Sequence, residues 1–158
     1  MQQVLRSWQV PLIVNDRVDV AMAAEAEGVH LGQTDMDPLD ARRLMGPHAL
    51  LGWSVETLAQ VRAAAELPVD YLGISPVYDT PSKADTAPAW GLSGLRRARE
   101  CTALPLVAIG GVNADNAAAL RAAGADGLAV VRAIASATHP EAAARSLRAL
   151  VNPASRPH

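Results

Sequence analysis

Short apolar runs alternate with longer alanine-rich stretches along the whole chain. The apolar runs are nearly continuous in Val, Ile and Leu and are bounded by Gly, Pro and Asp, as is typical of parallel strands buried on both faces. They predict strands near residues 11–15, 28–32, 49–53, 69–75, 105–109 and 127–131. The stretches between them repeat apolar residues at helical spacing, as Leu58, Val61 and Ala65 do. They predict helices near residues 18–27, 37–45, 56–66, 91–102, 114–123 and 140–151.

The alternation of six strands with six helices indicates a parallel α/β fold. A doubly wound sheet and a (β/α)8 barrel both fit this order. Both place their chemistry at the carboxyl ends of the strands, where polar residues gather in this chain. No Gly-x-Gly-x-x-Gly fingerprint opens the first unit, which argues against dinucleotide binding. A barrel has eight strands and about 200 residues or more, so this chain is two strands short of one.

Length and charge narrow the class of protein further. The 158 residues predict a single domain over residues 1–151, with the breaker-rich residues 152–158 as a disordered tail. The net charge is −2 and no basic block or Lys/Arg-rich face is present, so neither nucleic acid nor a membrane surface is an expected partner. The one cysteine, Cys101, cannot form an internal disulfide, and no apolar run is long enough for a signal peptide or a membrane span. A cytoplasmic protein is therefore expected.

Polar side chains follow the first two predicted strands. Asn15 and Asp16 close the first strand, and Asp35 follows the second. If these strands are parallel neighbours, their carboxyl ends hold two carboxylates side by side, which is what Mg²⁺ needs when waters and phosphate complete its shell. The alternative is that these aspartates begin helices, as aspartate commonly does, although Asp19 and Asp37 are better placed for that.

Ser54 follows the third predicted strand and has two interpretations. Its hydroxyl either caps the helix that follows or contacts a ligand. The chain has no Gly-x-Ser-x-Gly elbow and no histidine that the sequence places beside Ser54, so a serine nucleophile is not expected. His30 lies within an apolar run and is expected to be a hydrogen-bonded core residue, and no two histidines have metal-ligand spacing.

The loop after the fourth predicted strand is long and contains the run Thr80-Pro81-Ser82-Lys83. Loops of this length in a compact domain are often functional, and two hydroxyls with an ammonium can grip phosphate oxygens. The same residue types are ordinary in loops, so the motif alone is a weak signal.

Two glycines and an arginine mark the ends of the last two predicted strands. Gly110 and Gly111 close the fifth strand, where backbone N–H groups can approach an anion closely and the next helix begins with positive potential. The last strand ends at Val131 and Arg132. Barrels often hold phosphate with their last two βα loops, so these residues predict a phosphate site. Two tight turns without a ligand are the alternative.

Taken in order, six runs of this sequence resemble the thiamine-phosphate synthase family, which includes the related thiazole tautomerases. The runs are PLIVNDR (11–17), GVHLGQ (28–33) with Asp35, GISP (73–76), TPSK (80–83), VAIGG (107–111) and GLAVV (127–131). Each run alone is unspecific, and their order from about residue 4 to residue 151 makes the resemblance strong.

The resemblance implies a (β/α)8 barrel and a transferase of thiamine biosynthesis. Members of this family join a hydroxymethylpyrimidine diphosphate to a thiazole phosphate, or its carboxylate, and release pyrophosphate. The resemblance assigns Mg²⁺ to Asp16 and Asp35. It assigns contacts with the pyrimidine diphosphate to Asn15, Ser54 and Lys83, and it implies that Ser54 and Lys83 are catalytic. It places the thiazole phosphate among Thr80, Pro81, Ser82, Gly111, Val131 and Arg132.

The sequence departs from the family pattern in three places. The family's first two βα units, with a Gln-Leu-Arg-Glu-Lys run that helps to hold the diphosphate, have no counterpart here. Arg132 stands where a serine is usual, and it would either grip phosphate more strongly or crowd the site. Glu56 stands where the tautomerases carry a catalytic histidine, which argues against tautomerase chemistry.

A barrel without two of its units has two open edges and an exposed apolar interior, which favours aggregation or pairing. Three explanations are compatible with the sequence: Met1 is an internal methionine of a longer chain, the gene is a degraded remnant, or two chains complete one another as a homo-oligomer. The helix-like residues 4–8 favour the first explanation. Beside the synthase, a tautomerase-like relative and an inactive phosphate-binding remnant are therefore the alternative functions.

Overall fold

The computed structural model describes residues 2–79 and 88–151. The chain forms two compact units, which divide between Leu72 and Gly73. The single domain expected over residues 1–151 stays a prediction, and the tail expected at 152–158 lies outside the described residues. None of the helices in these described ranges is long and apolar enough to cross a membrane.

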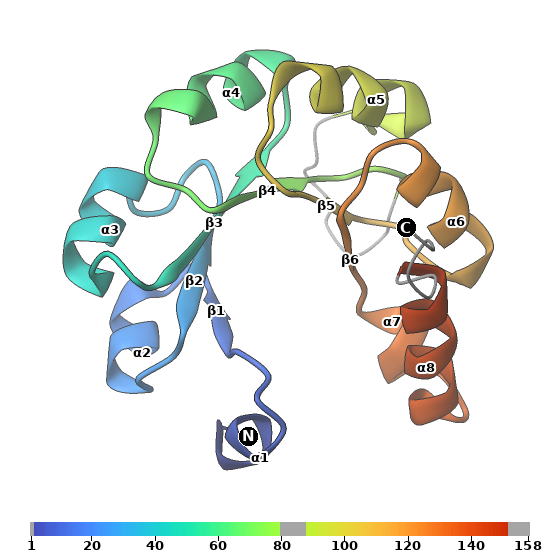
Figure 1. Cartoon of the computed structure of the whole chain (residues 1–158), viewed down its shortest axis with the longest axis horizontal. Coiled ribbons are helices and arrows are strands. Elements are labelled where there is room, and N and C mark those ends of the chain that lie inside the picture. The colour runs from blue at the N-terminus through green and yellow to red at the C-terminus, as the bar shows by residue number, and fades with distance from the viewer. Residues whose placement is uncertain (1, 80–87, 152–158) are drawn as a thin grey trace, which may run out of the picture. The chain divides into compact units, whose positions relative to one another are not determined.

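The first unit alternates helices with parallel strands. Its helices are α1 (Gln2–Ser7), α2 (Val18–Ala23), α3 (Pro38–Met45), α4 (Leu58–Ala63) and the 3-10 helix η1 (Ala64–Glu66). Its strands are β1 (Ile13–Asn15), β2 (Gly28–Leu31) and β3 (Leu50–Val55), and β4 (Tyr71–Ile74) begins at its end. The sheet order is β1-β2-β3, all parallel, and α2, α3 and α4 lie on one side of these strands (Figure 1).

The register of this sheet brings polar residues of neighbouring strands together. Asn15 of β1 is paired with His30 of β2, and His30 is paired with Gly52 of β3. Because parallel strands all end at the same edge, the residues that follow β1, β2 and β3 emerge on one side of the unit.

The second unit continues the same alternation. Its helices are α5 (Gly91–Cys101), α6 (Ala114–Ala122), α7 (Arg132–Ala135) and α8 (Pro140–Val151), and its strands after β4 are β5 (Leu106–Ile109) and β6 (Gly127–Ala129). β5 and β6 are parallel, with Ile109 paired with Ala129. In Figure 1, α8 lies beside α6, and the short α7 follows β6 and packs against α8.

The hydrophobic pattern predicts six strands and six helices, and the structure has an element at each of these places. The last strand ends at Ala129 rather than at Val131, because the backbone at Val131 has left the extended region (φ −115°, ψ −75°) and caps α7. α7 has four residues, too few to show a helical repeat of apolar positions. The parallel α/β class predicted from the pattern is confirmed.

Aliphatic side chains and alanines form the core of each unit. Fully buried strand residues include Leu31, Leu51 and Leu106, and fully buried helix residues include Ala21 and Ala98. Because the chain has no Phe, close packing of leucine and valine with alanine supplies the density that a protein interior needs. No charged or polar residue in the described ranges is buried.

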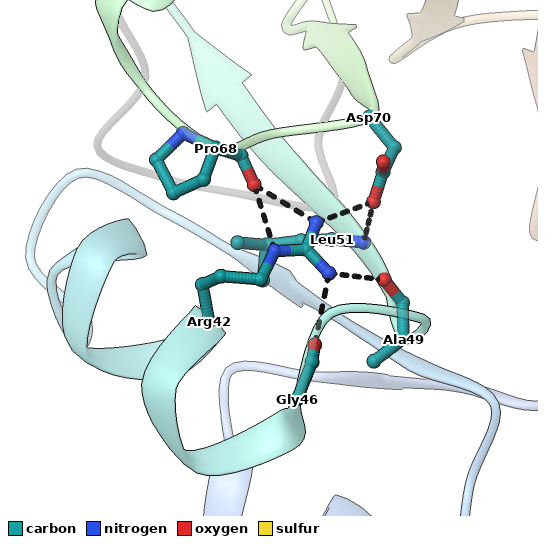
Figure 2. Close-up of polar contacts among 6 residues, drawn as sticks. All are labelled: Arg42, Gly46, Ala49, Leu51, Pro68 and Asp70. Carbon is teal, nitrogen blue, oxygen red and sulfur yellow. Dashed lines mark hydrogen bonds and ion pairs between the residues drawn. The ribbon is translucent and has the colours of Figure 1, made fainter.

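Arg42 of α3 ties the loops at the amino ends of β3 and β4 together (Figure 2). Its guanidinium donates hydrogen bonds to three backbone carbonyls, those of Gly46, Ala49 and Pro68. It also forms an ion pair with Asp70 at 2.7 Å, and the same carboxylate oxygen accepts a hydrogen bond from the Leu51 amide at 2.7 Å. Only 17% of the Arg42 side chain is exposed, so its loss would leave loop carbonyls without donors.

The second unit repeats this arrangement with Arg99 of α5. Arg99 donates to the carbonyls of Thr102 and Leu104 and forms an ion pair with Asp126 at 2.9 Å. The same Asp126 oxygen accepts a hydrogen bond from the amide of Leu106, the first residue of β5. In both units, therefore, an arginine from one helix and an aspartate before a later strand hold the amino end of the strand between them.

Replacing Arg42 with alanine should lower the free energy of unfolding by about 2–4 kcal/mol, because several carbonyls lose their charged donor. Arg43→Ala is the matched control. Arg43 lies next in the same helix, pairs with Asp40 at the surface and is 76% exposed, so its loss should change stability by about 0.5 kcal/mol or less. Urea denaturation of both variants measures the difference. Equal losses would show that the carbonyl contacts do not stabilise the unit.

Candidate active site

Asp16 lies just beyond β1 in a backbone conformation that few residues other than glycine adopt. Its φ is +66°, in the left-handed region. Its amide donates a hydrogen bond to the His30 carbonyl of β2 at 2.8 Å, and the Asn15 side-chain amide donates to Asp16 Oδ1 at 2.7 Å. The strained turn is therefore tied to the neighbouring strand, and it presents an exposed residue at the carboxyl edge of the sheet.

Asp35 follows β2 at the same edge of the first unit. It is half-buried, and its Oδ2 accepts a hydrogen bond from the Gly32 amide at 2.6 Å. Asp37 rather than Asp35 caps α3, because Asp37 Oδ1 accepts a hydrogen bond from the Leu39 amide at 2.8 Å. The expectation that Asp37 begins this helix is confirmed.

Asp19 does not cap α2, which corrects the other capping prediction. It lies in the first turn of that helix, after Arg17 at the N-cap position, and it accepts hydrogen bonds from the Arg17 guanidinium at 2.8 and 2.5 Å. This hydrogen bonding lowers the pKa of Asp19 to about 2. Arg17 and Asp19 are two residues apart at the start of the helix, and Asp19 forms an ion pair with Arg17. The residue at the N-cap position, Arg17, makes no side-chain capping hydrogen bond.

Asp16 and Asp35 supply a donor set that fits a magnesium ion carried by a phosphate ligand. Both follow neighbouring parallel strands, and carboxylates are the hard oxygen ligands that Mg²⁺ prefers. No group of three or more His, Cys, Asp or Glu side chains in residues 2–79 and 88–151 is arranged to hold a metal ion. These residues therefore form no all-protein cage. Mg²⁺ commonly takes one or two carboxylates, with waters and substrate phosphates as its other ligands, and the pair suits that arrangement.

Ser54, near the end of β3, is hydrogen-bonded to a histidine. His30 Nε2 lies 2.8 Å from Ser54 Oγ, and His30 Nδ1 lies 3.0 Å from the Tyr71 hydroxyl. The expectation that His30 is hydrogen-bonded is confirmed, and the expectation that Ser54 has no histidine partner is wrong. The sequence does not show this contact, but the register of the sheet does. His30 is paired with Gly52, and Ser54 lies two residues further along β3, so the side chains of His30 and Ser54 are on the same face of the sheet.

Ser54 does not cap the helix that follows it. Thr57 is the N-cap of α4, and Thr57 and Gln60 form a capping box. Gln60 also donates to Gln33 Oε1 at 2.8 Å, and Gln33 Nε2 donates to the Ser54 carbonyl at 2.5 Å. The loop after β2 and the end of β3 are therefore fixed to the start of α4, while the Ser54 hydroxyl is turned toward His30.

Gly110 and Gly111 at the end of β5 are held against the segment that follows β4. Both have positive φ values, +93° and +66°, which glycine adopts without strain. A Cβ on Gly110 would lie 2.9 Å from Pro76 Cβ, and a Cβ on Gly111 would lie 2.7 Å from Tyr78 Cβ. The Tyr78 amide also donates to the Gly110 carbonyl at 3.2 Å, so the two segments are in direct backbone contact. Only glycine fits these two positions without displacing its neighbours.

Asn113 and Asn116 fix the start of α6 next to these glycines. Asn113 is the N-cap, and the two side chains form a capping box. Asn116 Nδ2 also donates to the Gly111 carbonyl at 2.9 Å. One side chain therefore holds both the helix start and the glycine loop, at the end of the helix that carries positive potential.

Val131 and Arg132 lie at the start of α7 in the second unit. Val131 is 75% exposed, and Arg132 is exposed and makes no ion pair with any residue of the described ranges. A guanidinium in this state can donate two parallel hydrogen bonds to a phosphate. The other candidate site residues, Thr80, Pro81, Ser82 and Lys83, lie outside the described residues.

Comparisons with known sequences agree on one family. A family model described as thiamine monophosphate synthase matches residues 1–134. The thiamine-phosphate synthase of Albidiferax ferrireducens is 55% identical over 152 residues, which cover 96% of this chain and 69% of that protein. The thiamine-phosphate synthase of Vibrio campbellii is 49% identical over 151 residues, which cover 96% of this chain and 74% of that protein.

A solved structure has the same fold. The thiamine phosphate pyrophosphorylase from Pyrococcus furiosus matches with a TM-score of 0.87 and 38% sequence identity, over 96% of this chain and 72% of that one. The expected fold class, a partial TIM-barrel-type α/β fold, is therefore confirmed, with six strands within residues 2–79 and 88–151.

Proposed function

This chain belongs to the thiamine monophosphate synthase family, and on that basis we propose how its two units contribute to the synthesis of thiamine phosphate. The chain is a transferase of the thiamine-phosphate synthase type. Its proposed substrates are a hydroxymethylpyrimidine diphosphate and a thiazole phosphate, and its products are thiamine phosphate and pyrophosphate. The described candidate residues of the first unit bind the diphosphate with Mg²⁺, and those of the second unit bind the thiazole phosphate.

The observation that carries the proposal is the position of Asp16 and Asp35 after two paired parallel strands. Mg²⁺ held by these carboxylates would neutralise charge on the diphosphate as it becomes a leaving group. The Asn15 side-chain amide and the Ser54 hydroxyl donate hydrogen bonds to diphosphate oxygens, and Lys83 adds a positive charge to the same group. The assignment of Lys83 rests on the resemblance to the family alone.

Gly111, Val131 and Arg132 are the described residues proposed for the thiazole phosphate. Two observations support them: Gly111 lies so close to Tyr78 that a Cβ would not fit, and the Arg132 guanidinium has no ion-pair partner within the described ranges. Arg132 replaces the serine that is usual in the family, and its guanidinium makes a bidentate contact with the phosphate. The candidates that complete this site by resemblance to the family are Thr80, Pro81 and Ser82, which lie outside the described residues.

The reaction requires this chain mainly to stabilise a leaving group. The carbon–oxygen bond between the pyrimidine methylene and the diphosphate breaks, its electron pair leaves with pyrophosphate, and the thiazole nitrogen forms the new carbon–nitrogen bond. Hydrogen bonds from Asn15, Ser54 and Lys83 strengthen as negative charge builds on the leaving oxygen. They therefore lower the barrier instead of only binding the substrate.

A tautomerase activity is not favoured, because Glu56 stands where the related tautomerases carry a histidine. Glu56 is exposed, and its backbone amide donates to Gln60 Oε1 at 2.7 Å. A phosphate-binding protein without turnover is an alternative of another class, since it needs only the second-unit residues. A turnover assay separates it from the synthase.

Incubation of the purified chain with both substrates and Mg²⁺ should produce thiamine phosphate and pyrophosphate in equal amounts. Chelation of Mg²⁺ should stop product formation, because two carboxylates repel the diphosphate unless a cation lies between them. Mass spectrometry of thiamine phosphate and an enzymatic pyrophosphate assay measure the two products. Binding of thiazole phosphate without any product would instead support the phosphate-binding alternative.

A further inference from the structure

Three side chains from three strands of the first unit form a row of hydrogen bonds. Tyr71 of β4 bonds to His30 Nδ1 of β2 at 3.0 Å, and His30 Nε2 bonds to Ser54 Oγ of β3 at 2.8 Å. The imidazole and the phenol ring are also stacked, with centroids 5.4 Å apart and planes 27° from parallel. Both bonds and the stacking fix the orientation of the imidazole, which in turn fixes the position of the Ser54 hydroxyl.

The row depends on the absence of a side chain at Gly52. Gly52 is the register partner of His30 and lies two residues before Ser54 on β3. A Cβ at this position would lie 2.2 Å from Tyr71 Cζ and 2.4 Å from His30 Nδ1. Both atoms belong to rigid rings, so neither can move aside without breaking the row. Glycine at position 52 is therefore a requirement of the Tyr71–His30 contact.

The donors and acceptors in the row can be assigned from Tyr71. Burial raises the pKa of the Tyr71 hydroxyl, so the phenol keeps its proton at neutral pH. Within the described residues, the hydrogen bond of this hydroxyl is the one to His30 Nδ1. We take the phenol as the donor and Nδ1 as the acceptor, the assignment in which the hydroxyl proton and the imidazole nitrogen satisfy each other. An imidazole that accepts at Nδ1 carries its proton at Nε2, and this N–H donates to Ser54 Oγ.

We propose that Tyr71 and His30 orient Ser54 so that its hydroxyl donates a hydrogen bond to the diphosphate. Because Ser54 Oγ accepts from His30 Nε2, its own proton is directed away from the imidazole and toward an anionic acceptor. Tyr71 and His30 are positioning residues, and Ser54 is the residue that touches the substrate. This inference rests on the proposed function of Ser54. It differs from serine activation by a base, which would need an unprotonated Nε2.

Two substitutions at His30 separate the two ends of the row. Glutamine places its side-chain amide near the former Nε2 position and can still donate to Ser54, whereas asparagine places its amide near Nδ1 and cannot. We expect kcat to fall about 10- to 100-fold for His30→Asn and for Ser54→Ala, and only a few-fold for His30→Gln. The KM for thiazole phosphate should not change. The double variant His30→Asn/Ser54→Ala should be no slower than Ser54→Ala alone. Additive losses, or equal losses for the two His30 variants, would overturn the proposal.

The protonation pattern of the imidazole gives a second readout that does not depend on turnover. Long-range ¹H–¹⁵N NMR spectra of the full chain, with the His30 signals assigned by their loss in His30→Gln, should show a protonated Nε2 and an unprotonated Nδ1. In Tyr71→Phe this fixed tautomer should be lost. A protonated Nδ1 with an unprotonated Nε2 would refute the proposed directions of the two hydrogen bonds. If the wild-type chain makes no thiamine phosphate, the proposed function fails, and the tautomer still decides whether the row exists.

Discussion

The variant Asp16→Asn/Asp35→Asn should lose kcat for thiamine phosphate about a thousandfold or more, and its fold should be unchanged. The two substitutions remove both negative charges proposed to hold Mg²⁺, and metal stabilisation of a leaving group supplies several kcal/mol of the barrier reduction. Asparagine tolerates the left-handed φ of +66° at position 16. At position 35 its side-chain oxygen can still accept the hydrogen bond from the Gly32 amide. Steady-state kinetics and circular dichroism measure the two expectations.

Asp37→Asn is the control for this double variant. It removes a negative charge two residues from Asp35, but Asp37 caps α3 through its bond to the Leu39 amide, and asparagine is an equally good cap. Its kcat should stay within about twofold of the wild type. Activity that survives the loss of both Asp16 and Asp35 carboxylates would show that these residues do not bind the metal.

Gly110→Ala should lower the free energy of unfolding by about 2–5 kcal/mol and weaken binding of thiazole phosphate. An alanine at φ +93° is strained by about 1–3 kcal/mol. Its Cβ would also lie 2.9 Å from Pro76 Cβ and 3.0 Å from Pro76 Cα, so the backbone on one side must move. Because Gly111 follows in the same turn, that movement displaces the proposed phosphate contact as well. Urea denaturation and calorimetric titration with thiazole phosphate measure the two losses.

Gly46→Ala separates the cost of an alanine at positive φ from the cost of a steric clash with Pro76. Gly46 has a similar φ, +84°, but a Cβ there would have no neighbour within 4 Å. Its substitution should therefore cost about 1–3 kcal/mol and leave thiazole phosphate binding unchanged. Equal losses of stability in Gly46→Ala and Gly110→Ala, with binding intact in both, would show that the close approach to Pro76 is unimportant.

The hydrophobic pattern predicts the fold well because most of the strands are short, largely apolar runs, and stretches with helical spacing separate them. The sequence also predicts the position of Asn15, Asp16 and Asp35 at one edge of the sheet, because neighbouring parallel strands end at the same edge. It does not predict the short helix α7, because four residues cannot display a periodic pattern. The predicted end of β6 is wrong for a different reason, because Val130 and Val131 continue the apolar run beyond the last strand residue, Ala129.

The spacing of residues along the sequence does not predict the hydrogen-bonded row of Tyr71, His30 and Ser54. His30 and Ser54 are 24 residues apart, and an apolar run around His30 suggests a core residue. Only the register between β2 and β3 brings them to the same face, and only the missing side chain at Gly52 makes room for Tyr71. Sequence spacing contains neither fact.

The central claim is that the first unit binds the diphosphate through Mg²⁺ and the second binds the thiazole phosphate, and isothermal titration of each ligand tests it most directly. Asp16→Asn/Asp35→Asn should lose Mg²⁺-dependent binding of pyrophosphate and keep the wild-type affinity for thiazole phosphate. Arg132→Ala should do the reverse, with thiazole phosphate bound about 10- to 100-fold more weakly. Mg²⁺-dependent binding of pyrophosphate that persists without the Asp16 and Asp35 carboxylates would contradict the account.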